Sequence, residues 1–278
     1  MRTLSIFISA VAGIILHGAA YADNFASPWV TGAGAKARLV VAGGPLSGTW
    51  QAAVEIRLEP GEVTYWRSPG ETGVPPTFDF QGSDNLGTAK VAYPAPHALT
   101  EAGGIEAFGY QTKVLFPVAV TPARAALPVT LHLNFNYAAC ATICAPLHAS
   151  LALDLPMQAA SSPFAAEITA WRALVPKQIT VTSAAMATAI ARAPGAGKPV
   201  WVVRPQKLGV AAKHLFVEPP DGYYVTSKAD GDEGTFRLTL SDAPTDPKTS
   251  LVPVRITATG KNGAVEWHGT LDVSPSKP

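Results

Sequence analysis

Two cysteines, Cys140 and Cys144, lie close together in the stretch Tyr137-Ala-Ala-Cys-Ala-Thr-Ile-Cys-Ala-Pro146, and the chain has no others. Cysteines this close normally pair in an oxidising compartment. By chain entropy, a crosslink closing about five residues stabilises a fold by about 2 kcal/mol, against roughly 4.7 kcal/mol for a loop of about 100. A chain of 278 residues can bury its own core without so weak a crosslink. On spacing alone, a redox role and a structural role both stay open.

The spacing of this pair differs from the Cys-x-x-Cys of thioredoxin-type helices, in which a helix N-terminus stabilises the attacking thiolate. Here three residues separate the cysteines and no helix is predicted between them. Other groups would therefore have to stabilise a thiolate. Tyr65, Tyr137 and His148 are the candidate neighbours.

A second hypothesis combines Cys140, Cys144 and His148, because two thiolates and an imidazole suit soft metals such as Cu(I). Pro146 argues against one helix carrying all three residues. We favour His148 as a solvent-facing strand residue, and we predict no metal site and no cofactor. The motifs Gly-x-Ser-x-Gly, His-Glu-x-x-His and Walker A are absent.

Aromatic, cationic and turn residues gather in the segment Tyr65–Pro76. One interpretation is a surface that contacts a partner. The alternative is a rigid Pro/Gly connection in which Tyr65 and Trp66 pack inward.

Alternation of apolar and polar residues dominates the chain and predicts strands with one buried face. Turn signals such as Pro60-Gly61 and Gly103-Gly104 separate the runs. We therefore predict an all-β protein with an immunoglobulin-like antiparallel sandwich. The predicted strands centre on Trp50–Leu58, Val114–Val120, Val129–Tyr137, Leu151–Leu155, Val200–Val203, Phe236–Leu240, Val252–Ala258 and Val265–Val273.

One helix interrupts the strands, with Ser162 as its predicted N-cap, Pro163 at its first position and Pro176 at its end. The Ala-rich segment from Thr182 to Gly197 fits either a short helix or a loop. The predicted organisation is a signal peptide over residues 1–22, an immunoglobulin-like domain over 23–158, a linker helix over 159–176 and a second, smaller β domain over 177–278.

The N-terminus has the pattern of a secretion signal: Arg2, an apolar stretch from Leu4 to Ala20, and the small-x-small site Ala20-Tyr21-Ala22. An uncleaved membrane anchor is the rival interpretation. No later stretch reaches the roughly 18 apolar residues of a spanning helix, so we expect no membrane span after cleavage. Removing Arg2 leaves 20 basic against 20 acidic residues, and this neutrality argues against nucleic acid as a partner.

Several of these residues together resemble the periplasmic N-terminal region of DsbD-type disulfide reductases, and in particular the ScsB subgroup linked to copper tolerance. The resemblance covers about residues 27–157, and more weakly a second module at about 198–273. It is carried by the stretches Tyr65–Phe80, Gly109-Tyr110, Leu115–Val118 and Asn136-Tyr137-x-x-Cys140-x-x-x-Cys144-x-Pro146.

The resemblance implies that Cys140 and Cys144 form a redox-active disulfide in a periplasmic protein. In that family, such a pair takes electrons from a membrane-embedded electron-transfer protein and passes them to periplasmic thioredoxin-like partners. Full-length members also carry a transmembrane core and a thioredoxin domain. We expect this chain to lack both, so that a separate membrane protein would reduce it as part of a disulfide reductase system.

Relatives shield the disulfide with an aromatic residue on a cap loop. The equivalent stretch here, Leu99 to Phe108, is Gly-rich, and Ile105 or Phe108 would have to substitute for that aromatic. The main hypothesis is thus thiol–disulfide interchange. The alternatives are Cu(I) binding and a non-catalytic immunoglobulin-like interaction module with a structural disulfide.

Overall fold

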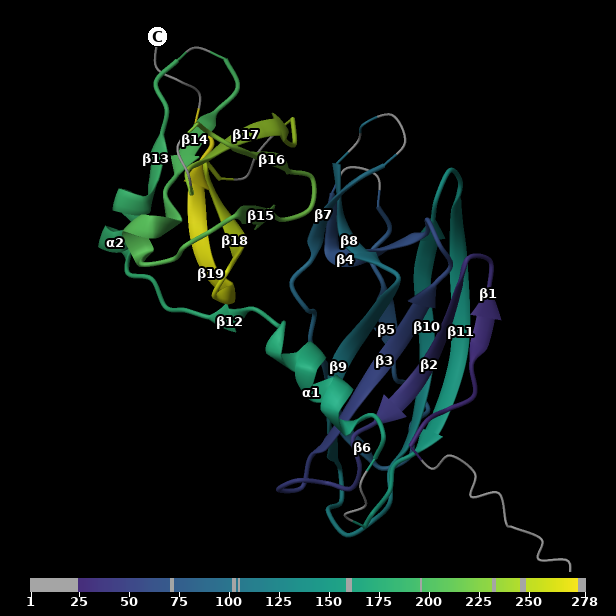
Figure 1. The fold of residues 1–278 in the computed structure, drawn as a ribbon. Helices are drawn as coiled ribbons and strands as arrows, with labels where there is room; N and C mark the ends of the chain where they lie inside the picture. Colours follow the sequence, from purple (N-terminus) through teal and green to yellow (C-terminus); the bar gives the residue numbers. More distant parts are fainter. Residues whose placement is uncertain are drawn as a thin grey trace, which may run out of the picture.

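The computed structural model describes residues 25–70, 73–101, 104, 106–158, 162–195, 197–231, 234–245 and 249–274. Within these residues the chain forms two β bodies with a short helix between them (Figure 1). The predicted signal peptide lies outside the described residues. Across the described part, no helix is long and apolar enough to span a membrane.

The first body is a sandwich of two antiparallel sheets. Its strands are β1 (Val30–Gly32), β2 (Ala35–Val41), β3 (Trp50–Leu58), β4 (Val63–Gly70), β5 (Thr77–Asp79), β6 (Leu86–Val91), β7 (His97–Thr100), β8 (Glu106–Gln111), β9 (Lys113–Pro122), β10 (Thr130–Cys140) and β11 (Cys144–Asp154). One sheet has the order β1-β2-β3-β9-β6 and the other the order β11-β10-β4-β8-β7, with β5 also pairing with β10.

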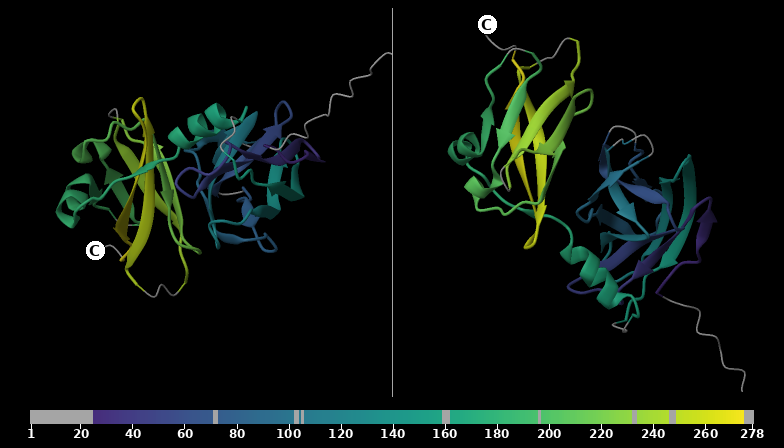
Figure 2. Two further views of the ribbon diagram at one scale, coloured as in Figure 1. Left: turned by 90° about the horizontal axis from the view of Figure 1, so that it is seen from below. Right: turned by 45° about the horizontal axis from the view of Figure 1, so that its top comes forward.

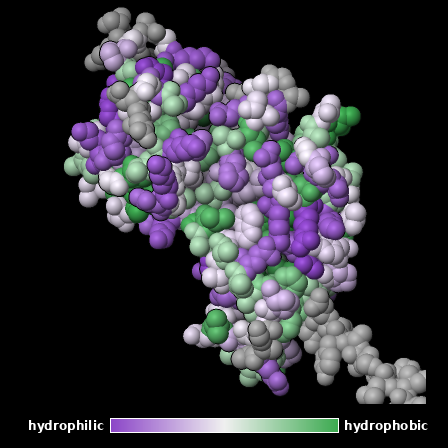
Figure 3. Space-filling model, viewed as in Figure 1, coloured by the Kyte–Doolittle hydropathy of each residue, from purple (hydrophilic) through white to green (hydrophobic). Residues whose placement is uncertain are grey.

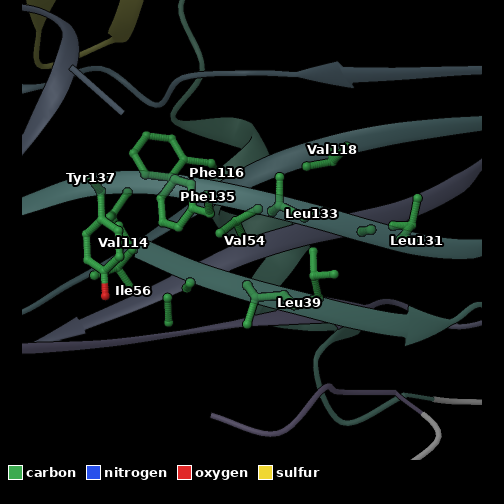
Figure 4. Close-up of a cluster of buried hydrophobic side chains, with 14 of the residues drawn as sticks. Leu39, Val54, Ile56, Val114, Phe116, Val118, Leu131, Leu133, Phe135 and Tyr137 are labelled. Carbon is green, nitrogen blue, oxygen red and sulfur yellow. The ribbon is translucent and has the colours of Figure 1, made fainter. Parts of the chain in front are cut away.

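The main core lies between these two sheets (Figure 4). It is formed by the side chains that point inward at every second position along the strands. Val54 and Ile56 of β3 and Phe116 of β9 face Leu133 and Phe135 of β10, and all are fully or almost fully buried. Burial of one such side chain stabilises the fold by roughly 1.5–3 kcal/mol. The alternation of apolar and polar residues in the sequence thus identifies the strand faces that pack together between the two sheets.

Helix α1 (Ala165–Ala173) covers the outer face of the first sheet. Its buried residue Ile168 packs with Val40, Ala53 and Leu115, which alternate with core residues along β2, β3 and β9. The helix begins at Ala165, after Phe164 as its N-cap, and not after the predicted N-cap Ser162. The Ser162 hydroxyl donates to the Val41 carbonyl at 2.6 Å, so Ser162 ties the approach to the helix to the sheet.

A buried carboxylate holds charged groups beneath this helix. Glu55 accepts hydrogen bonds from Arg38, Arg57 and Lys113, and Lys113 also pairs with Glu167 of α1 at 2.5 Å. Burial alone would raise the pKa of Glu55, but the hydrogen bonds from these cations outweigh it and the pKa is lowered. Glu55 therefore stays charged and anchors the helix through Lys113.

The second body is also built from two sheets, with strand orders β12-β19-β18-β15 and β13-β14-β17-β16. The Ala-rich segment contains a helix, α2 (Ser183–Ala189), which Thr182 caps through its hydroxyl. The strands are β12 (Lys177–Gln178), β13 (Ile190–Arg192), β14 (Val200–Val203), β15 (His214–Glu218), β16 (Tyr224–Ala229), β17 (Phe236–Asp242), β18 (Leu251–Gly260) and β19 (Gly263–Asp272), with a 3-10 turn η2 (Pro205–Leu208). The predicted fold class, an immunoglobulin-like sandwich followed by a second β body with a helix between them, is confirmed.

The two bodies lie side by side (Figure 2), and side chains of one pack against side chains of the other. Phe216 of β15 is 1% exposed and belongs to the core cluster of the first body. Its ring lies 4.9 Å from the ring of Phe108 and 5.8 Å from that of Trp66, both in edge-on geometry. Such aromatic pairs contribute roughly 0.5–1.5 kcal/mol beyond their buried area. The second body therefore completes the core of the first.

An arginine of the first body is held by two carboxylates of the second. Arg67 of β4 donates from Nε and Nη2 to Glu218, each at 2.8 Å, and its Nη2 also contacts Glu266. All three side chains are largely buried. Buried carboxylates without their cation are costly, so this pairing fixes how the bodies meet.

Replacing this arginine should loosen the contact between the bodies. We expect Arg67→Ala to lower the free energy of unfolding by about 3 kcal/mol, because Glu218 and Glu266 then lose their buried cation. Urea unfolding measures the loss. The matched control is Arg237→Ala, which breaks an exposed pair with Asp230 and should cost less than about 1 kcal/mol. Equal losses in the two variants would contradict the assignment.

Candidate redox site at the end of the β10–β11 hairpin

The antiparallel ladder of β10 and β11 brings the two cysteines together. Pairing runs from Thr130 opposite Asp154 to Cys140 opposite Cys144, which form the last pair before the turn. A disulfide joins Cys140 and Cys144 across this pair. Only Ala141, Thr142 and Ile143 lie between them. The predicted strand up to Tyr137 thus continues to Cys140 itself.

The two sulfurs lie in different environments. Cys140 is 2% exposed and packs in a small apolar cluster with Tyr65, Leu99, Ala107 and Ala138. Cys144 is exposed to solvent. Because an attacking thiolate must reach the sulfur along the S–S axis, Cys144 is the accessible sulfur of the pair.

Tyr65 of β4 is the polar side chain beside the disulfide. Its hydroxyl lies 3.6 Å from Sγ of Cys144 and donates a hydrogen bond to the Glu101 carboxylate at 2.5 Å. The ring is fully buried. The chain folds back over it at Gly73, where a Cβ would lie 2.6 Å from Cδ1 of Tyr65. This close approach explains why a glycine occupies position 73.

Burial raises the pKa of Tyr65, and the hydrogen bond to Glu101 and the charge of that carboxylate raise it further. Its hydroxyl therefore stays protonated over the physiological range. The hydroxyl has one proton and donates it to Glu101, so it must turn from Glu101 toward Cys144 to donate to a thiolate at that sulfur when the disulfide opens. Tyr65 is thus the candidate for the stabilising group that a thiolate here would need in place of a helix N-terminus.

The structure separates the three predicted neighbours of the cysteines. Tyr65 reaches the pair. Tyr137 instead faces the main core and stacks on Phe135 with ring centroids 4.7 Å apart. His148 lies on the exposed face of β11, where its ring contacts Asn136 at 2.9 Å and Ser150 at 3.1 Å. The sequence left two interpretations of the segment Tyr65–Pro76, a partner surface or inward packing of Tyr65 and Trp66. These two residues lie on β4 and are fully buried, so they pack inward.

The Cu(I) ligand set is not assembled in the structure. His148 lies four residues along the strand from Cys144, which corresponds to about 13 Å. Among the residues that the structure describes, no group of three or more His, Cys, Asp or Glu side chains is placed to hold a metal ion.

The structure locates one of the two residues that could substitute for the aromatic shield. Phe108 packs against Phe216 in the contact between the two bodies. Ile105 lies outside the described residues. Among the described residues, Leu99 and Tyr65 pack with Cys140 in its buried cluster. Glu101 was not predicted, because an acidic residue in a Gly-rich connection carries no signal of what it will contact.

The fold and the site define a class: an immunoglobulin-like domain with a close disulfide at the end of a hairpin. Residues 37–156 match the family described as thiol:disulfide interchange protein DsbD, N-terminal. These residues therefore belong to the DsbD N-terminal domain family, and the resemblance predicted from the sequence is confirmed. A search of curated protein sequences found no match.

The solved structures include one with a similar fold over both bodies. The N-terminal periplasmic domain of ScsB from Proteus mirabilis superposes with a TM-score of 0.66 at 20% identity, covering 90% of this chain and 100% of that chain. At this identity the likeness shows a shared fold. A chimeric titin Z1Z2 functionalised with an exogenous decorin peptide covers 90% of this chain and 97% of its own at 11% identity, but its TM-score of 0.19 supports no argument.

The hydroxyl of Tyr65 should control the reactivity of the reduced pair. We expect Tyr65→Phe to slow alkylation of the reduced protein at neutral pH about tenfold, because a hydrogen bond to a charged group contributes roughly 1.5–3 kcal/mol. The measurement is the rate of iodoacetamide labelling across pH. Tyr137→Phe, whose ring faces the core, is the matched control and should react at the wild-type rate. Similar rates in all three proteins would exclude Tyr65 from the chemistry.

Proposed function

We propose that this chain is a periplasmic thiol–disulfide interchange protein that carries electrons through Cys140 and Cys144. The observation that carries the proposal is the asymmetry of the disulfide: Cys144 is exposed, whereas Cys140 is buried in the Tyr65–Leu99 cluster. A disulfide that only pins a hairpin requires no such difference. Membership of residues 37–156 in the DsbD N-terminal family supports the same function.

The geometry supports an order of steps. In the reduced protein, the Cys144 thiolate attacks a disulfide of the partner, which forms a mixed disulfide and releases one partner thiolate. The Cys140 thiolate then attacks Sγ of Cys144, which restores the intramolecular disulfide and releases the second partner thiolate. Two electrons pass from the cysteine pair to the partner. The reverse sequence, with an external dithiol as donor, reduces the pair again.

The proposed partners follow from this chemistry and from the family. The electron donor is a membrane-embedded electron-transfer protein, and the acceptors are thioredoxin-like proteins of the periplasm. The ScsB domain of similar fold is itself described as periplasmic. An oxidising compartment also suits a chain whose cysteines are disulfide-bonded.

The reduction potential of the pair separates a carrier from a structural crosslink. We expect a value between about −270 and −180 mV, the range of thioredoxin-type carriers and isomerases. Titration against glutathione, with thiol trapping and mass spectrometry, measures it. A value below about −300 mV would identify a structural disulfide and overturn the proposal.

The assignment of the attacking cysteine can be tested with single-cysteine variants. Cys140→Ser leaves the exposed Cys144, and Cys144→Ser leaves the buried Cys140. Each is mixed with a thioredoxin whose attacking cysteine carries 2-nitro-5-thiobenzoate, and release of the coloured thiolate is followed. The Cys140→Ser variant should react faster, on the order of tenfold, because exchange depends on access to the thiol. Faster reaction of Cys144→Ser would reverse the assignment.

A further inference from the structure

An apolar side chain stands at the tip of the hairpin, between the two cysteines. Ile143 is 82% exposed, the highest value among the large hydrophobic side chains in the described residues, ahead of Leu46 at 69%. The space-filling view shows hydrophobic surface at this end of the β10–β11 hairpin (Figure 3). A single exposed apolar residue is ordinary on a protein surface. The position of this one is what requires an explanation.

The turn itself gives Ile143 no partner within the hairpin. The Ala141 amide donates to the Ile143 carbonyl at 3.4 Å, so the backbone of the turn closes on itself while the side chain points away. The surrounding segment from Ala141 to Pro146 contains no charged residue. Hairpin turns usually carry polar residues, Gly or Pro, which solvate well. The tip is therefore uncharged and, apart from Thr142, apolar, although the local structure does not require this.

The chemistry of the pair dictates what must cover this tip. The mixed disulfide joins Cys144 to a cysteine of the partner through a bond of about 2 Å. The partner's backbone therefore comes within a few ångströms of the two residues next to Cys144. These are Ile143, which is exposed, and Ala145, which is partly buried. A charged group of the partner placed against Ile143 would lose its water without gaining a pair.

We infer that Ile143 is the docking anchor of the redox site, and that it fits a partner whose disulfide is surrounded by an uncharged, apolar surface. This inference rests on the proposed function and names the surface through which it operates. The occupant is a thioredoxin-like protein presenting its own cysteine pair. The contact is small, as is usual for transient redox encounters, and the partner can dissociate after exchange.

The test compares a protein substrate with a small thiol. Wild type, Ile143→Ser and Leu46→Ser are each reacted with reduced thioredoxin and with dithiothreitol, and the second-order rate of disulfide reduction is measured. Leu46 is an exposed apolar residue outside the hairpin and serves as the matched control. Ile143→Ser should slow the reaction with thioredoxin about tenfold, because burial of an aliphatic side chain strengthens a complex by this factor or more.

The reaction of Ile143→Ser with dithiothreitol should stay at the wild-type rate, since a small thiol needs no docking surface. Leu46→Ser should match wild type with both reagents. Equal thioredoxin rates for wild type and Ile143→Ser, or an equal loss with dithiothreitol, would overturn the inference. Failure of the proposed function itself gives a different result: wild type would then have a structural reduction potential, and thioredoxin would not reduce it.

Discussion

The β10–β11 ladder is the constraint on which the candidate site depends. Because the strands pair in register up to their last residues, Cys140 and Cys144 lie directly opposite each other before any bond joins them. The backbone hydrogen bonds of the ladder do not require the disulfide. We therefore expect the two thiols to stay close when the bond is open, which favours rapid reclosure. A crosslink over so short a loop also adds little stability, so opening it threatens the fold little.

Three consecutive residues of β4 link this hairpin to the rest of the molecule. Tyr65 faces the disulfide, Trp66 lies in the main core against Phe216, and Arg67 is held by Glu218 and Glu266 of the second body. The position of the Tyr65 hydroxyl therefore depends on contacts made on both sides of the strand. The second body contributes to the site by fixing β4, although it supplies no group that contacts the sulfurs in the described structure.

The sequence predicts the parts of the fold that show strong local patterns. Large apolar residues alternate along Trp50–Leu58 and Val129–Tyr137, and the structure has a core strand at each of these two segments. Strand β2 was not predicted, because two of its buried positions, Ala35 and Ala37, are alanines with little hydrophobic signal. The cysteine pair was evident from spacing. Its environment was not, because Tyr65 meets Cys144 across 79 positions and Arg67 meets Glu218 across 151.

The surroundings of the two sulfurs divide the proposed exchange between them. An exposed sulfur can meet many disulfides, but selectivity then has to come from the surface around it. A buried sulfur meets only its neighbour, so it can resolve a mixed disulfide without entering side reactions. Cys140 is the buried sulfur, enclosed by Leu99 and Tyr65, and Cys144 is the exposed one. In the exchange that we propose, the apolar tip beside Cys144 is the feature that selects partners, because the sulfur itself does not discriminate.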